Sequence, residues 1–347
     1  MKGVVFTAVG AEPKVVDDLP VPVPGPDQVL VKSIWTAINP VDAFMSQYGL
    51  LVVNWPLVLG VDAAGVITDS GNEATEKYGL KAGDEVFGCT RLGCKGYSAG
   101  QEYYLMDARV TIPKPKNISL VEASTLGVGV ETACLGLFAG LNIPLPDPKN
   151  LPAALDEWVV ILGGASSVGK AAIQLAKASG YKVAASCSSK SSSVVEELGA
   201  VPFDYKAPLE EQLKKVLDIT SGEASKVFDA VASDDPAICK QLFKAIKASD
   251  KFFATTNDWN PTIHDFEGGR TYKVQLGEIG RPEGTELNDK IEKYIPLIVA
   301  LIETGKLKPS EYEIIGKGGF DDALKAYHHQ VSGAGGSRKV VVKIQDP

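Results

Sequence analysis

The chain has 347 residues, 45% of them hydrophobic and 22% charged, and its formal net charge is −8. This length and composition are typical of a globular chain with two domains. Nucleic-acid binding is not expected, because phosphate recognition needs a clustered basic face and the sequence has no basic run. A membrane span is not expected either, because the best candidate, residues 295–302, is far shorter than the ~18 apolar residues required and contains Pro296.

The N-terminus carries no sign of secretion, because residues 1–7 lack the continuous apolar region of a signal peptide. The five cysteines are odd in number and scattered along the chain, so a disulfide framework is not expected. Both observations favour a reducing compartment, and we predict a cytoplasmic location.

The first 125 residues are rich in valine, glycine, proline and aspartate, with short apolar runs between turn signals. Residues 29–34, for example, follow the turn-forming residues 24–27, and residues 65–67 form another apolar run. Short strands separated by turns predict an antiparallel barrel or sandwich. The chain ends in a further predicted strand, residues 338–344, which could return to this first domain.

From Glu157 onward the pattern changes to alternating strands and helices. A helix is expected at residues 169–179, directly after a glycine-rich turn. Strands are expected at residues 158–162, 182–185, 226–231 and 251–255. This alternation predicts an α/β domain with a doubly wound parallel sheet.

The glycine-rich turn has the pattern Gly164-x-Ser166-x-x-Gly169. A buried strand runs into it, and it opens a helix whose first amides can face a pyrophosphate. Ser166 replaces the middle glycine of the usual G-x-G-x-x-G, and similar turns also occur without a ligand. In this strand–turn–helix setting the pattern predicts a nucleotide site. Its expected contacts are Gly164, Ser166, Ser167, Val168 and Gly169.

The end of the second strand indicates which nucleotide is bound. An NAD site needs an acidic residue there to hold the ribose hydroxyls. This chain instead has Ser186, Ser188, Ser189 and Lys190, which offer hydroxyls and an ammonium to a 2′-phosphate. The pattern favours NADPH over NADH, with a solvated polar loop as the alternative.

Three motifs in the first domain carry a family resemblance: Ala-Ile-Asn-Pro-Val-Asp at residues 37–42, Leu-Gly-Val-Asp-Ala-Ala-Gly at 59–65 and Gly-Asp-Glu-Val-Phe-Gly at 83–88. In this order they resemble the catalytic domain of quinone-oxidoreductase-type medium-chain dehydrogenases/reductases. Phe-Asp-Tyr at residues 203–205 and Gly-Phe-Asp at 319–321 are similar to the fungal trans-acting enoyl reductases that serve polyketide synthases, the lovastatin-pathway type. The resemblance covers nearly the full chain.

The resemblance implies a GroES-like β-barrel catalytic domain of residues 1–125 and 311–347, and a Rossmann NADPH-binding domain of residues 126–310. In relatives, the positions of Lys190 and Tyr205 bracket the 2′-phosphate. Residues 276–280 would line the nicotinamide pocket largely through their backbone. The expected cofactor contacts therefore also include Leu276, Gly277, Ile279 and Lys339.

The resemblance also predicts that zinc is absent. Zinc alcohol dehydrogenases place a cysteine where Asn39 stands and Gly-His-Glu where residues 60–62 stand. The three histidines, His264, His328 and His329, lie far from these motifs in the sequence. Catalytic zinc needs about three protein ligands, so we expect none here. His328 and His329 are most simply a solvated helix end.

Without a Lewis acid, reduction of an activated C=C bond or a quinone is favoured over alcohol oxidation. The enolate from an enoyl thioester needs hydrogen-bond donors, and we expect Asn39, Thr132 and the cofactor's ribose to supply them. The alternatives are a turn for Asn39 and a helix N-cap for Thr132. Tyr48 is the fallback proton donor, with a surface or core tyrosine as the alternative and solvent as another source. Phe44 stands where the fungal enoyl reductases carry a lysine.

Four functions remain open on these grounds. The leading one is an NADPH-dependent reductase of an enoyl thioester or enone, with a small-molecule or carrier-bound substrate and a polyketide synthase as partner. The others are an NADPH:quinone oxidoreductase, which Phe44 favours, an aldehyde reductase, and a non-catalytic NADPH-binding sensor or structural protein. Both a monomer and a homodimer are compatible with the resemblance.

Some residues are candidates for the surroundings of the site, each with a plain structural alternative. Apolar walls could come from Phe44, Leu50, Trp55, Trp259 and Tyr272. Arg270, Lys273 and Arg281 could meet a phosphopantetheine or CoA phosphate, and a solvated charged face is the alternative for them.

Overall fold

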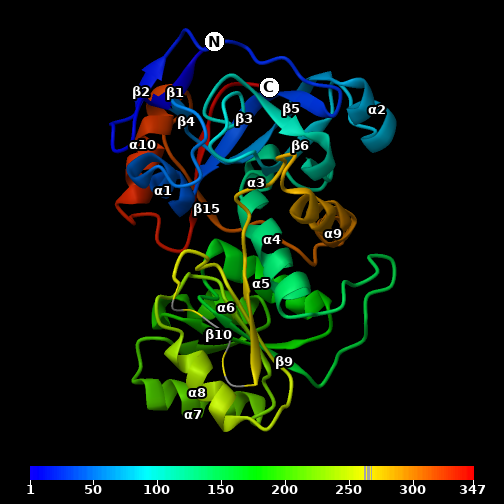
Figure 1. Ribbon diagram of the computed structural model, residues 1–347, viewed down its shortest axis with the longest axis vertical. Coiled ribbons are helices and arrows are strands. Elements are labelled where there is room, and N and C mark those ends of the chain that lie inside the picture. Colours follow the sequence, from blue (N-terminus) through cyan, green and yellow to red (C-terminus); the bar gives the residue numbers. More distant parts are fainter. Residues whose placement is uncertain (262, 264–265, 267) are drawn as a thin grey trace. The chain divides into compact units, whose positions relative to one another are not determined.

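The computed structural model describes residues 1–261, 263, 266 and 268–347, and it divides the chain into two compact units (Figure 1). Unit 1 consists of Met1–Val128, Leu276–Ile295 and Pro309–Pro347. Unit 2 consists of Gly129–Gln275 and Pro296–Lys308.

Unit 1 is built on antiparallel sheet. Its larger sheet runs in the order β15 (Tyr312–Ile314), β16 (Lys339–Lys343), β3 (Gln28–Ile38), β5 (Asp62–Ser70), β6 (Glu85–Cys89) and β8 (Ile112–Pro113), and β7 (Tyr103–Asp107) also pairs with β3. A smaller sheet joins β2 (Lys14–Val16), β1 (Gly3–Phe6) and β4 (Leu57–Val58). The strands expected in the first domain are confirmed.

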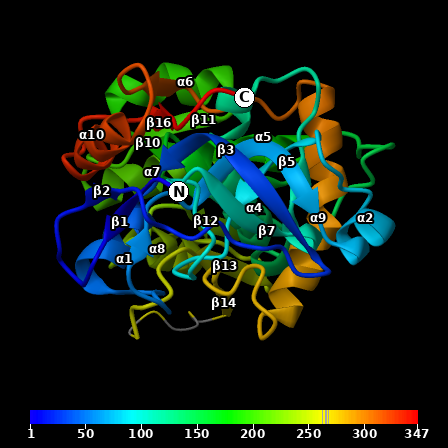
Figure 2. The same ribbon diagram turned by 90° about the horizontal axis from the view of Figure 1, so that it is seen from above.

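Strand β3, the long blue strand in Figure 2, organises unit 1. It pairs antiparallel with β5, β7 and β16, and its second half is almost wholly buried. The pairing with β16 confirms that the C-terminal strand returns to the first domain. Because Val340 lies opposite Ile38, this register places Lys339 opposite Asn39.

The helices of unit 1 flank these sheets. They are α1 (Pro40–Tyr48), α2 (Asn72–Tyr78), α3 (Leu120–Ala123), α10 (Phe320–Val331) and the first part of α9 (Thr285–Glu303). Helix α10 contacts β16, β1 and α1. Residues 295–302 lie within α9, and no helix among the described residues is long and apolar enough to cross a membrane.

Unit 2 contains a six-stranded parallel sheet. Its order is β11 (Val201–Asp204), β10 (Lys182–Cys187), β9 (Trp158–Leu162), β12 (Lys226–Asp229), β13 (Lys251–Thr255) and β14 (Gly269–Lys273). Numbered from β9, this is the 3-2-1-4-5-6 order of dinucleotide-binding sheets, and it confirms the predicted doubly wound domain. The order reverses between β9 and β12, where such sheets bind their ligands beyond the carboxyl ends of the strands.

Helices connect the strands of unit 2 and cover its core. They are α5 (Ser167–Ala178), α6 (Ser192–Glu197), α7 (Leu209–Thr220) and α8 (Ala237–Ala245), with α4 (Gly127–Cys134) leading in from unit 1. The core includes Val160, Phe203, Val227, Leu242 and Phe253. The apolar run that predicted β9, residues 158–162, is thus part of a core that also contains aromatic residues of β11 and β13.

One segment is grouped differently from the predicted domains. The prediction places residues 276–295 in the dinucleotide-binding domain, and the structure groups Leu276–Ile295 with unit 1. The physical reason is a set of hydrogen bonds from Arg91 and Arg281 that tie this segment to unit 1.

Candidate functional site

The glycine-rich turn of unit 2 is a compact link between β9 and α5. The Ser166 hydroxyl caps α5 by accepting the Gly169 N–H at 2.9 Å. Gly163 has a φ of +79°, and a methyl group on Gly169 would overlap the Gly163 carbonyl oxygen. Both positions therefore need glycine. The close packing leaves the first amides of α5 at the carboxyl end of β9, where they can face a ligand.

This turn fits a pyrophosphate. Val168 lies in the first turn of α5, where amide groups have no partner within the helix. The neighbouring Ser167 hydroxyl is buried, and no residue that the structure describes hydrogen-bonds to it. Gly164 packs so closely on β10 that a methyl there would lie 2.7 Å from the Ala185 side chain. An anion at the helix N-terminus would be stabilised by these amides and by this hydroxyl.

The end of β10 provides both support for the turn and an exposed polar edge. Ser186 is buried, and its hydroxyl accepts the Gly163 N–H at 2.8 Å, so this side chain supports the turn. Ser188 is half-buried with its hydroxyl 3.3 Å from that of Ser191, whereas Ser189 and Lys190 are exposed. Only the last two are therefore open to a ligand without rearrangement.

Strand β11 adds an aromatic ring and a second cation at the same edge. Cys187 pairs with Asp204, so Tyr205 leaves the sheet beside the Ser188–Lys190 segment. The Tyr205 side chain is 53% exposed. Lys206 is also exposed, with its ammonium 5.9 Å from the centre of the Tyr205 ring. Sequence reasoning did not single out Lys206, although its position directly after Tyr205 is a usable signal.

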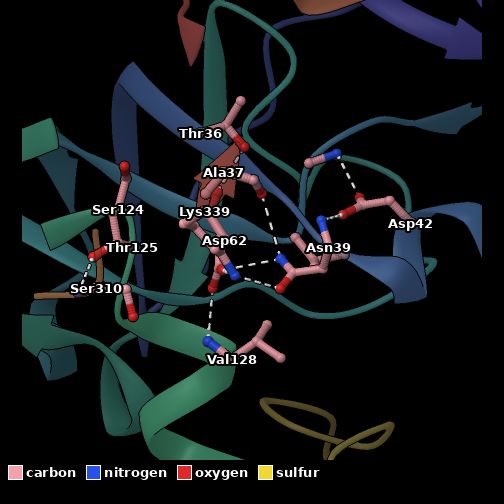
Figure 3. A network of polar contacts seen from close by, with 12 residues as sticks. Thr36, Ala37, Asn39, Asp42, Asp62, Ser124, Thr125, Val128, Ser310 and Lys339 are labelled. Carbon is pink, nitrogen blue, oxygen red and sulfur yellow. Dashed lines mark hydrogen bonds and ion pairs between the residues drawn. The ribbon is translucent and has the colours of Figure 1, made fainter. Parts of the chain in front are cut away.

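In unit 1, Asn39, Asp62 and Lys339 point toward one another in a buried polar network (Figure 3). The Lys339 ammonium lies 2.7 Å from Asp62 Oδ2 and donates to Asn39 Oδ1 at 2.5 Å. Asn39 Nδ2 donates to Asp62 Oδ2 at 2.9 Å and to the Ala37 carbonyl at 3.4 Å. The second carboxylate oxygen of Asp62 accepts the Val128 N–H at the start of α4, at 2.6 Å.

The network places two predicted site residues together, since Asn39 was expected near the nicotinamide and Lys339 among the cofactor contacts. Both amide atoms of Asn39 have protein partners, and the two shortest contacts, with Lys339 and Asp62, lie outside its own turn. The motif at residues 60–62 ends in an aspartate, and this aspartate pairs with a lysine. Sequence reasoning did not assign a role to Asp62.

Asp42 stabilises the beginning of α1. Its carboxylate accepts the Asn39 N–H at 2.8 Å and the Gly60 N–H at 3.0 Å. Burial raises the pKa of Asp42 to about 6, although these two hydrogen bonds act in the opposite direction. Asp42 therefore holds the turn between β3 and α1, the turn that carries Asn39.

Thr132 and Tyr48 lie in different surroundings. Thr132 is buried inside α4 of unit 2, so the N-cap interpretation of this residue is wrong. Tyr48 is the last residue of α1 in unit 1; its side chain is 65% exposed, and its ring centre is 6.5 Å from that of Phe44. Among the expected apolar walls, Phe44, Leu50 and Trp55 belong to unit 1, and Trp259 and Tyr272 to unit 2.

The segment that contains Leu276, Gly277 and Ile279 belongs to unit 1 and precedes α9. Ile279 is fully buried, and its N–H donates to the Leu276 carbonyl at 3.0 Å. Arg281, expected at a phosphate or in solvent, instead donates to the carbonyls of Leu51 and Leu92 at 3.1 and 2.7 Å. Its guanidinium is thus engaged within unit 1.

Among the residues that the structure describes, no three histidine, cysteine, aspartate or glutamate side chains are grouped as a metal ion would require. His264 lies outside the described residues. His328 and His329 occupy the last turn of α10, with their rings 3.8 Å from Glu12 and 3.6 Å from Glu313.

Comparison with known proteins agrees with this architecture. Residues 25–116 match the alcohol dehydrogenase GroES-like domain. The chain is 32% identical over 255 residues to the trans-enoyl reductase milB of Cordyceps militaris, covering 72% of this chain and 68% of that protein. It is 34% identical over 344 residues to the dehydrogenase azaJ of Aspergillus niger, covering 95% of each.

A solved structure has the same fold along the whole chain. It is an alcohol dehydrogenase superfamily protein from Novosphingobium aromaticivorans, with a TM-score of 0.79, 24% identity, and coverage of 99% of this chain and 100% of that one. This likeness shows the fold, and the two sequence relatives show the family. The chain belongs to the medium-chain dehydrogenase/reductase family, and it is an oxidoreductase.

Proposed function

We propose that this chain is an NADPH-dependent reductase of activated carbon–carbon double bonds, acting on an enoyl thioester or an enone. The observation that carries the cofactor choice is the polar edge of unit 2, where Ser189, Lys190, Tyr205 and Lys206 are exposed together. The observation that carries the substrate class is the similarity to a trans-enoyl reductase over most of the chain.

NADPH is favoured over NADH by charge. The residues that follow β10 include an ammonium and two hydroxyls, and no carboxylate stands between Ser186 and Lys190. A carboxylate there would accept both ribose hydroxyls and repel a 2′-phosphate. Lys190 and Lys206 would instead attract the phosphate, and Tyr205 would lie beside it.

When bound, NADPH supplies the hydride that reduces the acceptor carbon. The residues of the chain would bind and orient it: the first amides of α5 would hold the pyrophosphate, and residues 276–280 would face the nicotinamide. Asn39 remains a candidate donor to the substrate oxygen through the Nδ2 hydrogen whose bond to the Ala37 carbonyl is long, at 3.4 Å. Thr132 is the proposed second donor, and Tyr48 the proposed proton source.

The physiological substrate of this proposal is an acyl chain carried by a polyketide synthase in the cytoplasm. The relative milB is named a trans-enoyl reductase. The resemblance to the fungal trans-acting enoyl reductases that serve polyketide synthases implies a synthase partner here. A quinone is the second candidate acceptor, because the exposed Phe44 occupies the position at which the fungal enoyl reductases carry a lysine.

The acceptor is tested by following NADPH oxidation with purified protein and four acceptors: a short enoyl-CoA, an enone, a quinone and an aldehyde. The proposal expects turnover of the enoyl thioester or the enone, and a slower reaction or none with NADH. Turnover of the quinone alone would replace the proposal by the second candidate. Tight NADPH binding without oxidation by any of the four would favour a non-catalytic role.

A further inference from the structure

The backbone of residues 280 and 281 is held by two side chains from elsewhere in unit 1. The Gly280 carbonyl accepts from Arg91 Nη2 at 2.7 Å, and the Gly280 N–H donates to Asn288 Oδ1 at 2.8 Å. Asn288 Nδ2 also donates to the Arg281 carbonyl at 2.8 Å. This part of the chain, which includes the last of the expected nicotinamide-facing residues, is thus fixed through its peptide groups.

Arg91 is itself held in one orientation. Its Nε donates to Asp107 Oδ2 at 3.1 Å, and its Nη2 pairs with Asp107 Oδ1. The guanidinium carbon lies 4.4 Å from the centre of the Tyr97 ring, and Gln28 Nε2 donates to Asp107 from another side at 3.3 Å. Both charged side chains are largely buried, with 16% and 7% exposed. A two-pronged guanidinium–carboxylate pair has little orientational freedom, so the second hydrogen of Arg91 Nη2 is aimed at the Gly280 carbonyl.

Gly280 fits this arrangement only as glycine. Its φ is +73°, in the left-handed region. A methyl group at this position would overlap the Asp107 carboxylate. The ion pair therefore fixes the shape of the chain at Gly280 as well as one of its hydrogen bonds.

Arg281 ties the segment to unit 1 at a second place. It donates to the carbonyls of Leu51 and Leu92. Leu51 has a φ of +64°, which is unfavourable for a non-glycine residue, and its side chain lies against the α-carbon of Gly277. Arg281 thus stabilises the strained residue that Gly277 packs on.

We propose that Arg91, Asp107 and Arg281 are positioning residues that fix residues 276–280 in the form that binds the nicotinamide half of the cofactor. The role rests on the proposed function, in which these residues face the nicotinamide. A backbone segment that is already ordered loses less conformational entropy when its ligand binds. The three side chains act through peptide groups and Leu51, so their effect is on the affinity for the intact dinucleotide.

The first test compares Arg91→Gln with Arg109→Gln in the full chain. Arg109 also belongs to unit 1 and pairs with two carboxylates, but these are Asp289 and Glu292 of α9, outside residues 276–281. Loss of a charged hydrogen bond corresponds to roughly tenfold or more in an equilibrium constant. Fluorescence titration is expected to show NADPH binding at least about tenfold weaker in Arg91→Gln, and within about twofold of the unmodified protein in Arg109→Gln.

A second ligand distinguishes a positioning role of Arg91 from a general effect of the substitution on the fold. Adenosine 2′,5′-bisphosphate has the 2′-phosphate but no nicotinamide. Its affinity is expected to stay within about twofold in Arg91→Gln, because the turn after β9 and the edge of β10 belong to unit 2. Equal weakening of both ligands would mean that the substitution damages the fold, and it would overturn the positioning role.

Two further variants guard against misfolding caused by an unpaired Asp107. The double variant Arg91→Gln/Asp107→Asn removes both charges. The variant Gly280→Ala keeps both charged residues but places a methyl group against the Asp107 carboxylate and displaces the segment. Both are expected to weaken NADPH binding at least about tenfold and to leave the bisphosphate affinity unchanged. NADPH binding at the unmodified level in both variants would overturn the proposal.

Hydrogen exchange in the free protein reports on the segment without any cofactor. Amides of residues 279–281 are expected to exchange at least about tenfold faster in Arg91→Gln, with β3 and β9 unchanged. Faster exchange together with unchanged NADPH affinity would overturn the positioning role alone. No NADPH binding by the unmodified protein would overturn the proposed function, while the exchange result would still show whether Arg91 orders the segment.

Discussion

At the scale of single residues, the Asp62–Lys339 pair is the most consequential contact in unit 1. Both side chains are almost fully buried, at 0% and 5% exposed, and they lie 2.7 Å apart. Burying a charge away from water costs several kcal/mol for each ion. The attraction between the two ions offsets this cost only when both are present. Removing one partner therefore leaves an uncompensated charge in the interior.

We predict that Lys339→Met lowers the free energy of unfolding by about 3–5 kcal/mol, the usual cost of a broken buried ion pair. Adding Asp62→Asn to it should restore part of the loss, because the second substitution removes the unpaired charge. Urea denaturation of the two single variants and the double variant gives the coupling. Strictly additive losses would show that the two charges do not depend on each other.

The raised pKa of Asp42 predicts that the stability of the folded chain depends on pH. Its pKa in the folded chain is about 6, above the ordinary value of 3.8, because it is buried. Below about pH 4 the carboxyl is protonated in both the folded and the unfolded state, so its ionisation does not change the free energy of unfolding. As pH rises through about 6 the folded state must bear a buried carboxylate, so stability is lost. The shift of about 2 units corresponds to about 3 kcal/mol at 1.36 kcal/mol per unit.

The measurement compares the unmodified protein with Asp42→Asn, whose amide cannot ionise. Between about pH 4 and pH 7, the free energy of unfolding of Asp42→Asn is expected to rise by about 3 kcal/mol relative to that of the unmodified protein. A difference that is constant over this range would show that Asp42 does not titrate with a raised pKa.

Lys190 is expected to determine the selectivity between NADPH and NADH. Its exposed ammonium is the proposed partner of the 2′-phosphate, so Lys190→Ala is expected to raise the KM for NADPH at least about tenfold. The KM for NADH, which lacks this phosphate, should change less than about twofold. Lys215→Ala, at an exposed lysine of α7 in the same unit, is the matched control. An equal change for both cofactors in Lys190→Ala would contradict the assignment.

The sequence predicted single residues unevenly. Ser166 and Lys190 were singled out because their setting is local, a turn between a strand and a helix, and their contacts with a cofactor stay predictions. Lys339 and Asn39 are 300 positions apart, and their hydrogen bond depends on the register between β16 and β3. One signal was available: Asp62 is the only charge between Leu59 and Gly65, and a lone carboxylate in such a stretch indicates a buried partner.

At the scale of elements, the link between β9 and α5 depends on the contact between Gly169 and Gly163. We predict that Gly169→Ala lowers the free energy of unfolding by at least about 2 kcal/mol, because the new methyl group would overlap the Gly163 carbonyl and force the turn apart. NADPH affinity should fall as well. Ser166→Ala, which removes only a helix cap, should cost about 1 kcal/mol.

Thermal and urea denaturation test whether Gly169→Ala loses more stability than Ser166→Ala. A Gly169→Ala variant as stable as the unmodified protein would mean that the turn can relax around a side chain, and the close helix–strand packing would then not be required.

The elements that the sequence predicted best are those with a local pattern. Strands β9, β10, β12 and β13 are short, mostly apolar runs approached through turns or helices, and each was placed within a few residues of its observed bounds. The grouping of Leu276–Ile295 with unit 1 could not be predicted, because Arg91 and Arg281 resemble ordinary surface arginines until their partners are known.

At the scale of the whole molecule, each unit contributes a different part of the proposed reductase. Unit 2 has the dinucleotide sheet order and the polar edge at β10 and β11. Unit 1 contains the buried Asn39–Asp62–Lys339 network and the ordered segment before α9. The fold class followed from the alternation of elements, whereas the substrate class depends on similarity to relatives.

The most direct test of the central claim follows the hydride. Unmodified protein is incubated with a 2-enoyl thioester and NADPH that carries deuterium at C4 of the nicotinamide, using each C4 epimer in turn. With one epimer, mass spectrometry is expected to show the saturated thioester with one deuterium on the β-carbon, and a proton from solvent on the α-carbon. Consumption of the labelled NADPH with no saturated thioester formed would contradict the assignment as a double-bond reductase.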